Sequence, residues 1–397
     1  MTTAVLVDAV RTASGRGKPG GALSALHPVD LLATVLRGLV DRNDLDPALV
    51  DDVIGGCLAQ VGEQAVNITR NAVLGAGFPH SVPGTTIDRQ CGSSQQAVAF
   101  AVQGVLAGAY DVVIACGVEL MSTNPINSAT LGRDPWGPRV RARYPDGLVN
   151  QGISAELIAA RWHLDRTELD ECSARSHRLA AAATEAGCFA AEILPVTVPD
   201  ADGGSRSHTV DETIRASTTA AGLADLSPAF VDERLALRFP EIDWCITPGN
   251  SSPLTDGASA VLIMSEDRAA RLGLTPRARF VSSAVLGSDP IEMLTGVIPV
   301  THRILDRSGL GIDDIDAFEV NEAFAPVPLA WQRDVGADPD RVNRRGGAIA
   351  LGHALGSSGT RLLTTLIGEL EASGGRYGMQ VMCEGAGMAN ATIIERV

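Results

Sequence analysis

The sequence predicts an α/β protein whose core consists of two similar halves. Runs of apolar residues typical of buried strands alternate along the chain with segments that have the apolar spacing of amphipathic helices. Of the 397 residues, 45% are hydrophobic but only 4% are aromatic, and 42 are glycine, which favours close-packed layers of small aliphatic side chains. Two segments that lie far apart in the chain also repeat one another.

The first 120 residues contain the alternating elements in order. Strands are expected at 4–10, 53–58 and 112–116, and helices at 31–40 and 95–106. This order is typical of a mostly parallel sheet that is covered by helices. We therefore assign residues 1–120 to the first half of the core.

A different composition follows from residue 121 to about residue 253. Arginine, proline and glycine interrupt the pattern at 133–138, an alanine-rich helix is expected at 173–186, and a polar run covers 200–208. We interpret residues 121–253 as a loop domain inserted over the core.

Alternation resumes after this insertion. A strand at 258–264 would complete the first half, so that residues 254–274 belong with 1–120. Residues 275–397 form the second half, in which strands at 315–320 and 380–383 bracket a helix near 361–370.

The repeat relates the two halves. Gly92-Ser93-Ser94 matches Gly356-Ser357-Ser358, and each copy continues with a helix, a glycine and an apolar strand that ends at a cysteine, Cys116 or Cys383. Apolar residues recur at helical spacing in both copies: Val98, Ala101, Val102 and Val105 in one, Leu363, Leu366, Ile367 and Leu370 in the other. Duplication of an α/β half explains this economically; chance similarity of two glycine- and alanine-rich helices is the alternative.

Charge and cysteine usage narrow the class of function. A net charge of −15 disfavours binding to nucleic acid or to anionic membranes, so an anionic ligand would need locally placed arginines. Seven scattered cysteines without metal-ligand spacing favour reduced thiols over disulfides or a zinc site. Lys18 is the one lysine, which disfavours Schiff-base chemistry. Residues 1–11 do not resemble a signal peptide, and no window of 18 apolar residues follows, so we expect a cytoplasmic protein without membrane spans.

Cys91 is the first candidate for catalysis. It lies between a strand-like run at 85–88 and a helix that opens at Gly92 or Ser93. The free amides and the positive end of the dipole at a helix N-terminus favour a thiolate, which suits a nucleophile. The alternative is a small buried hydrophobic residue.

His353 and Cys383 are the second and third candidates. His353 lies in a glycine-rich loop, 346–356, where an imidazole can take a proton from a thiol or donate to an enolate. Cys383 ends an apolar strand before a glycine-rich turn, where it can serve as acid or base beside backbone amides. A structural histidine and a core cysteine are the alternatives.

Asn321 follows the strand at 317–320. It could be the N-cap of the next helix, or its side chain could orient a catalytic water.

Taken together, the motifs resemble the thiolase family. The resemblance covers essentially the whole chain and rests on VDAVRTASGR at the start, Cys91-Gly-Ser-Ser, GNSSPLTDGASAV from Gly249, NEAFA from Asn321, GGAIALGH ending at His353, and Cys383-x-Gly. It implies two βαβαβαββ halves in a five-layered αβαβα core, a loop domain at 121–253 that binds coenzyme A, and a homodimer or homotetramer.

The resemblance also implies a reaction and a set of residues. The enzyme would cleave 3-ketoacyl-CoA with CoA to acyl-CoA and acetyl-CoA, or catalyse the reverse condensation, with CoA as a substrate and no permanently bound cofactor. Cys91 would be the nucleophile, His353 its base and Cys383 the second acid and base. Asn321 would hold a water at one oxyanion site, and the amides of Cys91 and Gly385 would form the other. Arg215 would stack on adenine and Ser252 would contact pantetheine.

Several residues depart from the family pattern. Ala354 replaces the usual proline, Ala386 interrupts the usual glycine triplet after Cys383, Gln151 replaces a methionine, and the stretch 231–245 is longer and more apolar. We hypothesise a nonstandard acyl pocket, wider or more polar. The chain is most similar to bacterial degradative thiolases, including those of steroid catabolism.

Other functions remain open at this point. A biosynthetic acetoacetyl-CoA thiolase would share every catalytic residue, and a noncatalytic acyl-CoA or lipid carrier of the same fold would not need them. A thiol redox enzyme would use Cys383 as its resolving cysteine. A ketoacyl synthase would pair its cysteine with two histidines, whereas only His353 lies in a suitable loop.

Overall fold

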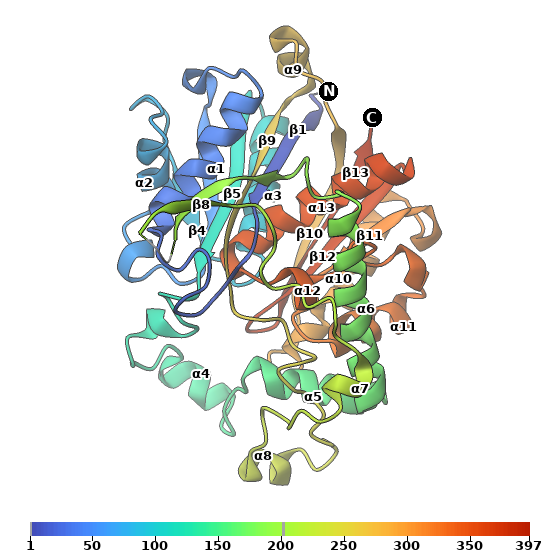
Figure 1. Ribbon diagram of the computed structural model, residues 1–397. Coiled ribbons are helices and arrows are strands. Elements are labelled where there is room, and N and C mark those ends of the chain that lie inside the picture. The colour runs from blue at the N-terminus through green and yellow to red at the C-terminus, as the bar shows by residue number, and fades with distance from the viewer. Residues whose placement is uncertain (1, 201–202) are drawn as a thin grey trace.

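A single large sheet organises the computed structural model, which describes residues 2–200 and 203–397 (Figure 1). Its strand order is β11-β12-β13-β10-β1-β9-β5-β3-β4. The strands of the first half are β1 (Ala4–Thr12), β3 (Asp52–Gly56), β4 (Thr85–Ile87), β5 (Val112–Leu120) and β9 (Thr255–Ser265). Those of the second half are β10 (Ala278–Gly287), β11 (Ala317–Val320), β12 (Tyr377–Glu384) and β13 (Met388–Arg396). The short strands β2 (Gly15–Arg16) and β6 (Ile193–Leu194) pair with β9 and β1.

The two halves of the sheet meet at β1 and β10. These strands pair antiparallel over a short register, Val5 with Arg279 and Leu6 with Ala278. Within the first half, β9 lies between β1 and β5 and pairs antiparallel with both. The segment after the insertion therefore completes the first half-sheet.

Helices form three layers around the two half-sheets. α1 (Pro28–Arg42) and α2 (Ile68–Gly75) share a core with the outer face of the first half. α3 (Ser93–Leu106) and α13 (Ser358–Ser373) share a second core with both halves. α10 (Val297–Ser308) and α11 (Pro326–Val335) cover the outer face of the second half. The five layers, helix, sheet, helix, sheet and helix, confirm the predicted fold.

The repeated Gly-Ser-Ser motifs bring the starts of the two central helices together. A Cβ atom added to Gly359 would lie 2.0 Å from the backbone nitrogen of Gln95, so only glycine permits this approach. The amide of Thr360 donates to Ser94 Oγ at 3.0 Å. Both repeats therefore place a helix N-terminus at the centre of the molecule.

The insertion between β5 and β9 contains more regular structure than its composition predicted. It includes α4 (Gly137–Arg143), α5 (Gln151–Arg161), α6 (Arg166–Glu185), α7 (Ala220–Leu223), α8 (Glu233–Arg238) and the hairpin of β7 (Val196–Pro199) with β8 (Ser205–His208). The expected helix begins earlier than residue 173 because Asp165 and Glu168 form a capping box at the start of α6. Of the polar run at 200–208, residues 201 and 202 lie outside the described residues. α9 (Glu266–Leu272) and α12 (Ala348–Leu351) are short helices of the two halves.

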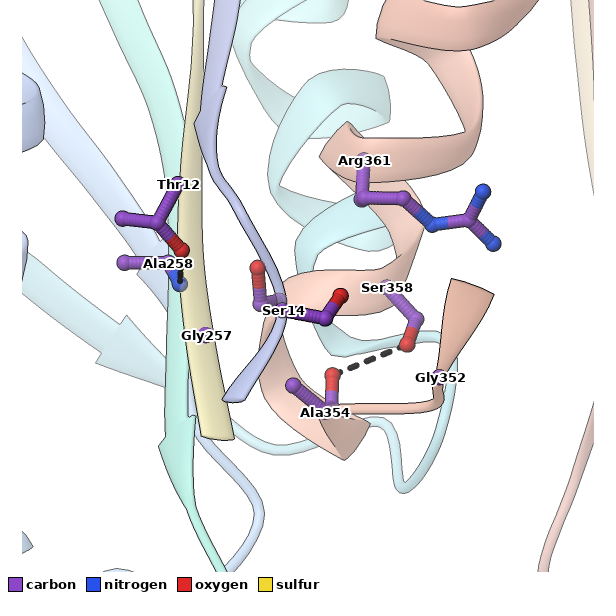
Figure 2. A pocket seen from close by; sticks show the side chains of 9 residues that line it. Thr12, Ser14, Gly257, Ala258, Gly352, Ala354, Ser358 and Arg361 are labelled. Atoms are coloured by element: carbon purple, nitrogen blue, oxygen red, sulfur yellow. Dashed lines mark hydrogen bonds between the residues drawn. The ribbon is translucent and has the colours of Figure 1, made fainter. Parts of the chain in front are cut away.

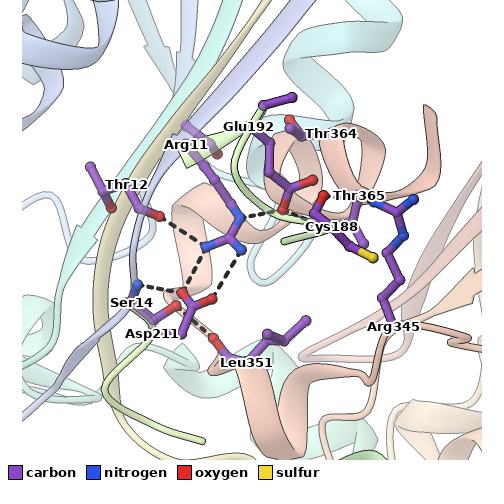
Figure 3. Close-up of polar contacts among 12 residues, drawn as sticks. Arg11, Thr12, Ser14, Cys188, Glu192, Asp211, Arg345, Leu351, Thr364 and Thr365 are labelled. Carbon is purple, nitrogen blue, oxygen red and sulfur yellow. Dashed lines mark hydrogen bonds and ion pairs between the residues drawn. The ribbon is translucent and has the colours of Figure 1, made fainter. Parts of the chain in front are cut away.

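Arg11 ties the insertion to the core. Figure 3 shows its guanidinium between two carboxylates, with Nε 2.7 Å from Glu192 Oε1 and Nη1 2.7 Å from Asp211 Oδ1. The side chain is 1% exposed. Burial acts to lower the pKa of Arg11, but the two carboxylates outweigh it and raise that pKa above its ordinary value.

The described residues were also compared with two structural patterns, a membrane-spanning helix and a metal site. Within residues 2–200 and 203–397, no helix is both long and apolar enough to span a bilayer. The same described residues contain no group of three or more His, Cys, Asp or Glu side chains arranged to hold a metal ion.

Candidate active site

Cys91 lies where the sequence predicted, at the amino end of α3. The helix begins at Ser93 with Gly92 as its N-cap, and the thiol is buried. The preceding turn is held by Ser93, whose Oγ donates to Gln90 O at 2.6 Å and accepts from Arg89 N at 2.9 Å. Gln90 has a positive φ of 51°, which turns the chain sharply into the helix. The local fold therefore points the helix dipole at Cys91.

The thiol of Cys91 is protonated in the resting site. Burial is the main cause that raises its pKa to about 12, and the charge of Glu384 adds to this. The side-chain amide of Gln151, whose Nε2 is 4.0 Å from Sγ, and the backbone amides of Gly385 and Cys91 itself favour the thiolate. A base is therefore needed to activate the nucleophile.

His353 has the properties of such a base. Figure 2 shows Ser358 donating to the carbonyl of Ala354, at 2.8 Å. Because the single hydroxyl hydrogen of Ser358 is used in this bond, its Oγ accepts from Nδ1–H of His353, 2.6 Å away. This leaves a lone pair on Nε2. Burial, assisted by the charge of Arg361, lowers the pKa of His353 to about 3, so the ring is neutral.

Asn321 lies at the end of β11 and contacts both the neighbouring strand and His353. It follows β11, and its backbone amide donates to Val381 O in β12 at 3.0 Å. Its Nδ2 lies 3.4 Å from His353 Nε2, while Oδ1 is buried and has no hydrogen-bond partner among the residues that the structure describes. The next helix, α11, begins at Pro326 with Ala325 as N-cap, so the interpretation of Asn321 as a helix cap is wrong.

Cys383 and Gly385 reach the same region from the end of β12. Cys383 is fully buried, and burial, followed by the charges of Cys91 and Glu384, raises the pKa of its thiol well above the usual value. A Cβ atom on Gly385 would lie 3.0 Å from Gln90 Oε1 and 3.4 Å from Gln151 Nε2. The structure thus brings Cys383 and Gly385 to Cys91. On the other side, Cys91 packs in one apolar cluster with Leu355, which follows His353 closely in the chain.

Ser252 and Arg215 lie on segments that pack near the stretches carrying Asn321 and His353. Ser252 donates from both its backbone nitrogen and its Oγ to Ala323 O, at 3.0 Å each, next to the NEAFA segment. Arg215 is exposed, and its backbone amide donates to His177 Nδ1 in α6 at 3.1 Å. The adjacent Ile214 packs against the cluster that contains Leu351, just before His353.

Sequence reasoning missed three contributors to the site. Ser358 fixes the tautomer of His353, and Thr255 Oγ1 accepts from the backbone amide of His353 at 2.9 Å. Glu384 acts on both cysteines through its charge. Gln151, which the sequence analysis had connected with the acyl pocket, also lies 4.0 Å from the Cys91 thiol. Ser358 and Glu384 had a signal in the sequence, since each lies within five residues of a predicted catalytic residue.

The site thus combines a buried thiol at a helix N-terminus, a second buried thiol and a neutral histidine near the same apolar cluster, groups that covalent acyl transfer can use.

Comparison with known proteins gives the family. The thiolase N-terminal domain model matches residues 4–267, and the thiolase C-terminal domain model matches residues 274–396. Steroid 3-ketoacyl-CoA thiolase FadA6 of Mycobacterium tuberculosis is 49% identical over 100% of this chain and 95% of its own length. A 3-ketoacyl-CoA thiolase of Serratia proteamaculans is 44% identical over 100% of both chains. The crystal structure of the Bacillus anthracis acetyl-CoA acetyltransferase superposes with a TM-score of 0.89 at 36% identity, covering 100% of this chain and 99% of that one. The chain belongs to the thiolase family, and its substrates are acyl-CoA and CoA.

Proposed function

We propose that this thiolase cleaves 3-ketoacyl-CoA with CoA, yielding acetyl-CoA and a shortened acyl-CoA, through an acyl thioester on Cys91. The observation that carries the proposal is the proximity of two buried thiols, Cys91 at the amino end of α3 and Cys383 in β12, whose neighbour Met382 packs in one cluster with Cys91. The names of the relatives from M. tuberculosis and S. proteamaculans support the substrate class. The reverse condensation would use the same groups.

The first half of the reaction forms the acyl-enzyme. His353 Nε2 takes the proton of Cys91, and the thiolate attacks the 3-keto carbon. The backbone amides of Cys91 and Gly385 stabilise the oxygen of the resulting tetrahedral intermediate. The C2–C3 bond then breaks, and the acetyl-CoA enolate takes its proton from Cys383. Asn321, through a water on its unpartnered Oδ1, and protonated His353 stabilise the enolate oxygen.

The second half releases the acyl group. The incoming CoA thiol gives its proton to the Cys383 thiolate and attacks the acyl carbonyl. The thiolate of Cys91 leaves and recovers its proton from His353, so every group returns to its starting state.

Intact-protein mass spectrometry after mixing with acetoacetyl-CoA tests this proposal. We expect a single acetyl adduct on the wild type that free CoA removes, no adduct on Cys91→Ala, and a normal adduct on the control Cys188→Ala, whose thiol is partly buried elsewhere. Absence of an adduct from the wild type, or its persistence in Cys91→Ala, would refute the mechanism. An adduct that CoA cannot clear would favour a carrier.

We assign the binding of CoA to residues of the 121–253 insertion and its border. Arginine suits stacking on a purine because its guanidinium is planar and weakly hydrated, which supports Arg215 at the adenine. The hydrogen bond of Ser252 to Ala323 O, two residues after Asn321, supports the proposed contact of Ser252 with pantetheine. A homodimer or homotetramer and a cytoplasmic location, in which seven thiols stay reduced, complete the proposal.

We infer an acyl site that combines a polar group with neighbouring apolar side chains. Gln151 begins α5, with its amide at the thiol of Cys91. The apolar stretch 231–245 packs on the same helix in a cluster that includes Ile153, Leu157, Phe230, Phe239, Ile242 and Trp244. We therefore assign this enzyme bulky acyl groups that carry an oxygen able to accept from Gln151.

Replacing Gln151 by methionine is expected to weaken the preference for bulky, oxygen-bearing acyl groups. The ratio of kcat/KM for a bulky, oxygen-bearing 3-ketoacyl-CoA to that for acetoacetyl-CoA should fall about tenfold, the discrimination that one lost hydrogen bond typically provides. The exposed Gln103→Met on α3 is the control and should leave the ratio unchanged. Equal ratios in wild type and Gln151→Met would contradict the assignment.

A further inference from the structure

Glu384 is a buried carboxyl at the amino end of α3. It is the last residue of β12, and its side chain is fully buried. Because side chains alternate along a strand, Glu384 points to the opposite face from Cys383, toward α3. A Cβ atom on Gly92 would lie 2.0 Å from Glu384 Oε1, so the carboxyl rests directly against the N-cap of the helix that carries Cys91.

This carboxyl lacks the hydrogen bonds that buried carboxyls normally have. Neither Oε1 nor Oε2 has a partner within residues 2–200 and 203–397. The amide of Asn390 in β13, which is the nearest side chain of that strand to Gly92, donates instead to Gly92 O at 3.3 Å. Nothing in the fold of this region depends on a bond to Glu384, although leaving the group unpartnered costs free energy.

The charged and titratable groups around Glu384 come from few elements. The loop between β4 and α3 contributes Asp88 and Arg89 besides Cys91, and β12 contributes Cys383. The first turn of α3 and the facing Asn390 are uncharged. Burial is the largest cause that raises the pKa of Glu384 to about 8, while Arg89 opposes this and Asp88 adds to it.

The charge of Glu384 raises the pKa of both active-site thiols, Cys91 and Cys383. The ionised form of Glu384 disfavours a thiolate at Cys91 and at Cys383 alike. It also competes with the Cys91 thiolate for the positive end of the α3 dipole, since both lie at the same helix terminus.

We propose that Glu384 is a positioning residue that controls how readily Cys91 and Cys383 lose their protons. The proposal rests on the roles given above to the two cysteines. With the carboxyl neutral, Cys91 is activated more easily. With the carboxyl ionised, having released its proton to solvent, Cys383 becomes the stronger base toward the incoming CoA thiol.

The rate at which Cys91 is alkylated reports how readily its thiol loses a proton, so the effect of Glu384 can be measured without catalytic turnover. The wild type and Glu384→Gln are treated with iodoacetamide from pH 6.5 to pH 9.5, and modification of Cys91 and Cys383 is followed by peptide mass spectrometry. The thiolate is the reactive form, so the logarithm of the rate should rise by one per pH unit in Glu384→Gln. In the wild type the line should bend near pH 8, leaving Cys91 about tenfold slower at pH 9.5, which corresponds to a shift of about one unit.

Two further variants complete the design. Glu395→Gln, at the opposite end of the β12–β13 hairpin and ion-paired to Arg376 near the surface, is the matched control and should keep the bend. Arg89→Gln removes the charge that opposes protonation of Glu384, so the bend should move to higher pH. If Glu384→Gln does not fold, the pH of the bend in Arg89→Gln tests the proposal in its place.

Superimposable curves for the wild type and Glu384→Gln, or a bend that Arg89→Gln leaves in place, would overturn the proposal. Failure of the proposed function shows separately, as absence of the acetyl adduct on Cys91.

Discussion

Replacing His353 by alanine is expected to lower kcat of thiolysis by about 10³-fold, within the range for loss of a general base. The substitution removes the lone pair on Nε2, which lies 3.4 Å from Asn321 Nδ2, so the thiol of Cys91, with its pKa of about 12, has no acceptor for its proton. It also removes a donor to the enolate oxygen. Thiolysis is measured as consumption of acetoacetyl-CoA in the presence of CoA.

Ser358→Ala is the informative comparison for this prediction. It keeps the imidazole but removes the acceptor that fixes Nδ1–H, so kcat should fall by about tenfold with little change in KM. If His353→Ala retained a tenth or more of the wild-type kcat while folding normally, another group would have to be the base.

Protonation of the His353 imidazole also determines how kcat/KM falls at acidic pH. Burial lowers the pKa of His353 to about 3, so the neutral form that acts as base is present above that pH. Between pH 5 and pH 7 the free enzyme should therefore show no loss of kcat/KM with a midpoint near 6.5, the ordinary value for histidine.

Replacing Arg11 by methionine should destabilise the fold by about 3–5 kcal/mol, the usual cost of removing one partner from a buried ion pair. Glu192 and Asp211 would be left as uncompensated buried charges beside β1 (Figure 3). We expect a clearly lower urea midpoint for Arg11→Met, and a partial recovery when Glu192→Gln and Asp211→Asn are added.

Arg37→Met is the matched control, because Arg37 pairs with Asp41 on the surface of α1 and both side chains are about half exposed. Water and salt screen an exposed pair of this kind, so the urea midpoint of Arg37→Met should hardly move. A loss in Arg11→Met no larger than in Arg37→Met would show that the insertion does not depend on this ion pair.

The parts of the fold that local patterns encode could be predicted. Apolar periodicity and the Gly-Ser-Ser motifs located α3 and α13, and with them the position of Cys91 at a helix start. The predicted bounds of a strand were less accurate where pairing with a distant strand extends it. β5 continues past Cys116 to Leu120 because β9 pairs with it along its whole length.

The contacts that tune the site could not be read from the sequence. Glu384 follows Cys383 directly, yet its burial against Gly92 depends on how the end of β12 packs on α3. The approach of Gln151 to Cys91 joins two distant segments. Asn321 was compatible with a cap or with the site, and only the start of α11 at Pro326 excludes the cap.

The place of β9 in the sheet determines how the first half assembles during translation. β1 and β5 are both made before residue 121, but the strand that joins them ends at Ser265. Until β9 leaves the ribosome, two apolar strands have unpaired edges, which are templates for aggregation. At about 5–20 residues per second, synthesis of the intervening segment lasts on the order of ten seconds, and throughout that interval these edges have no β9 to pair with.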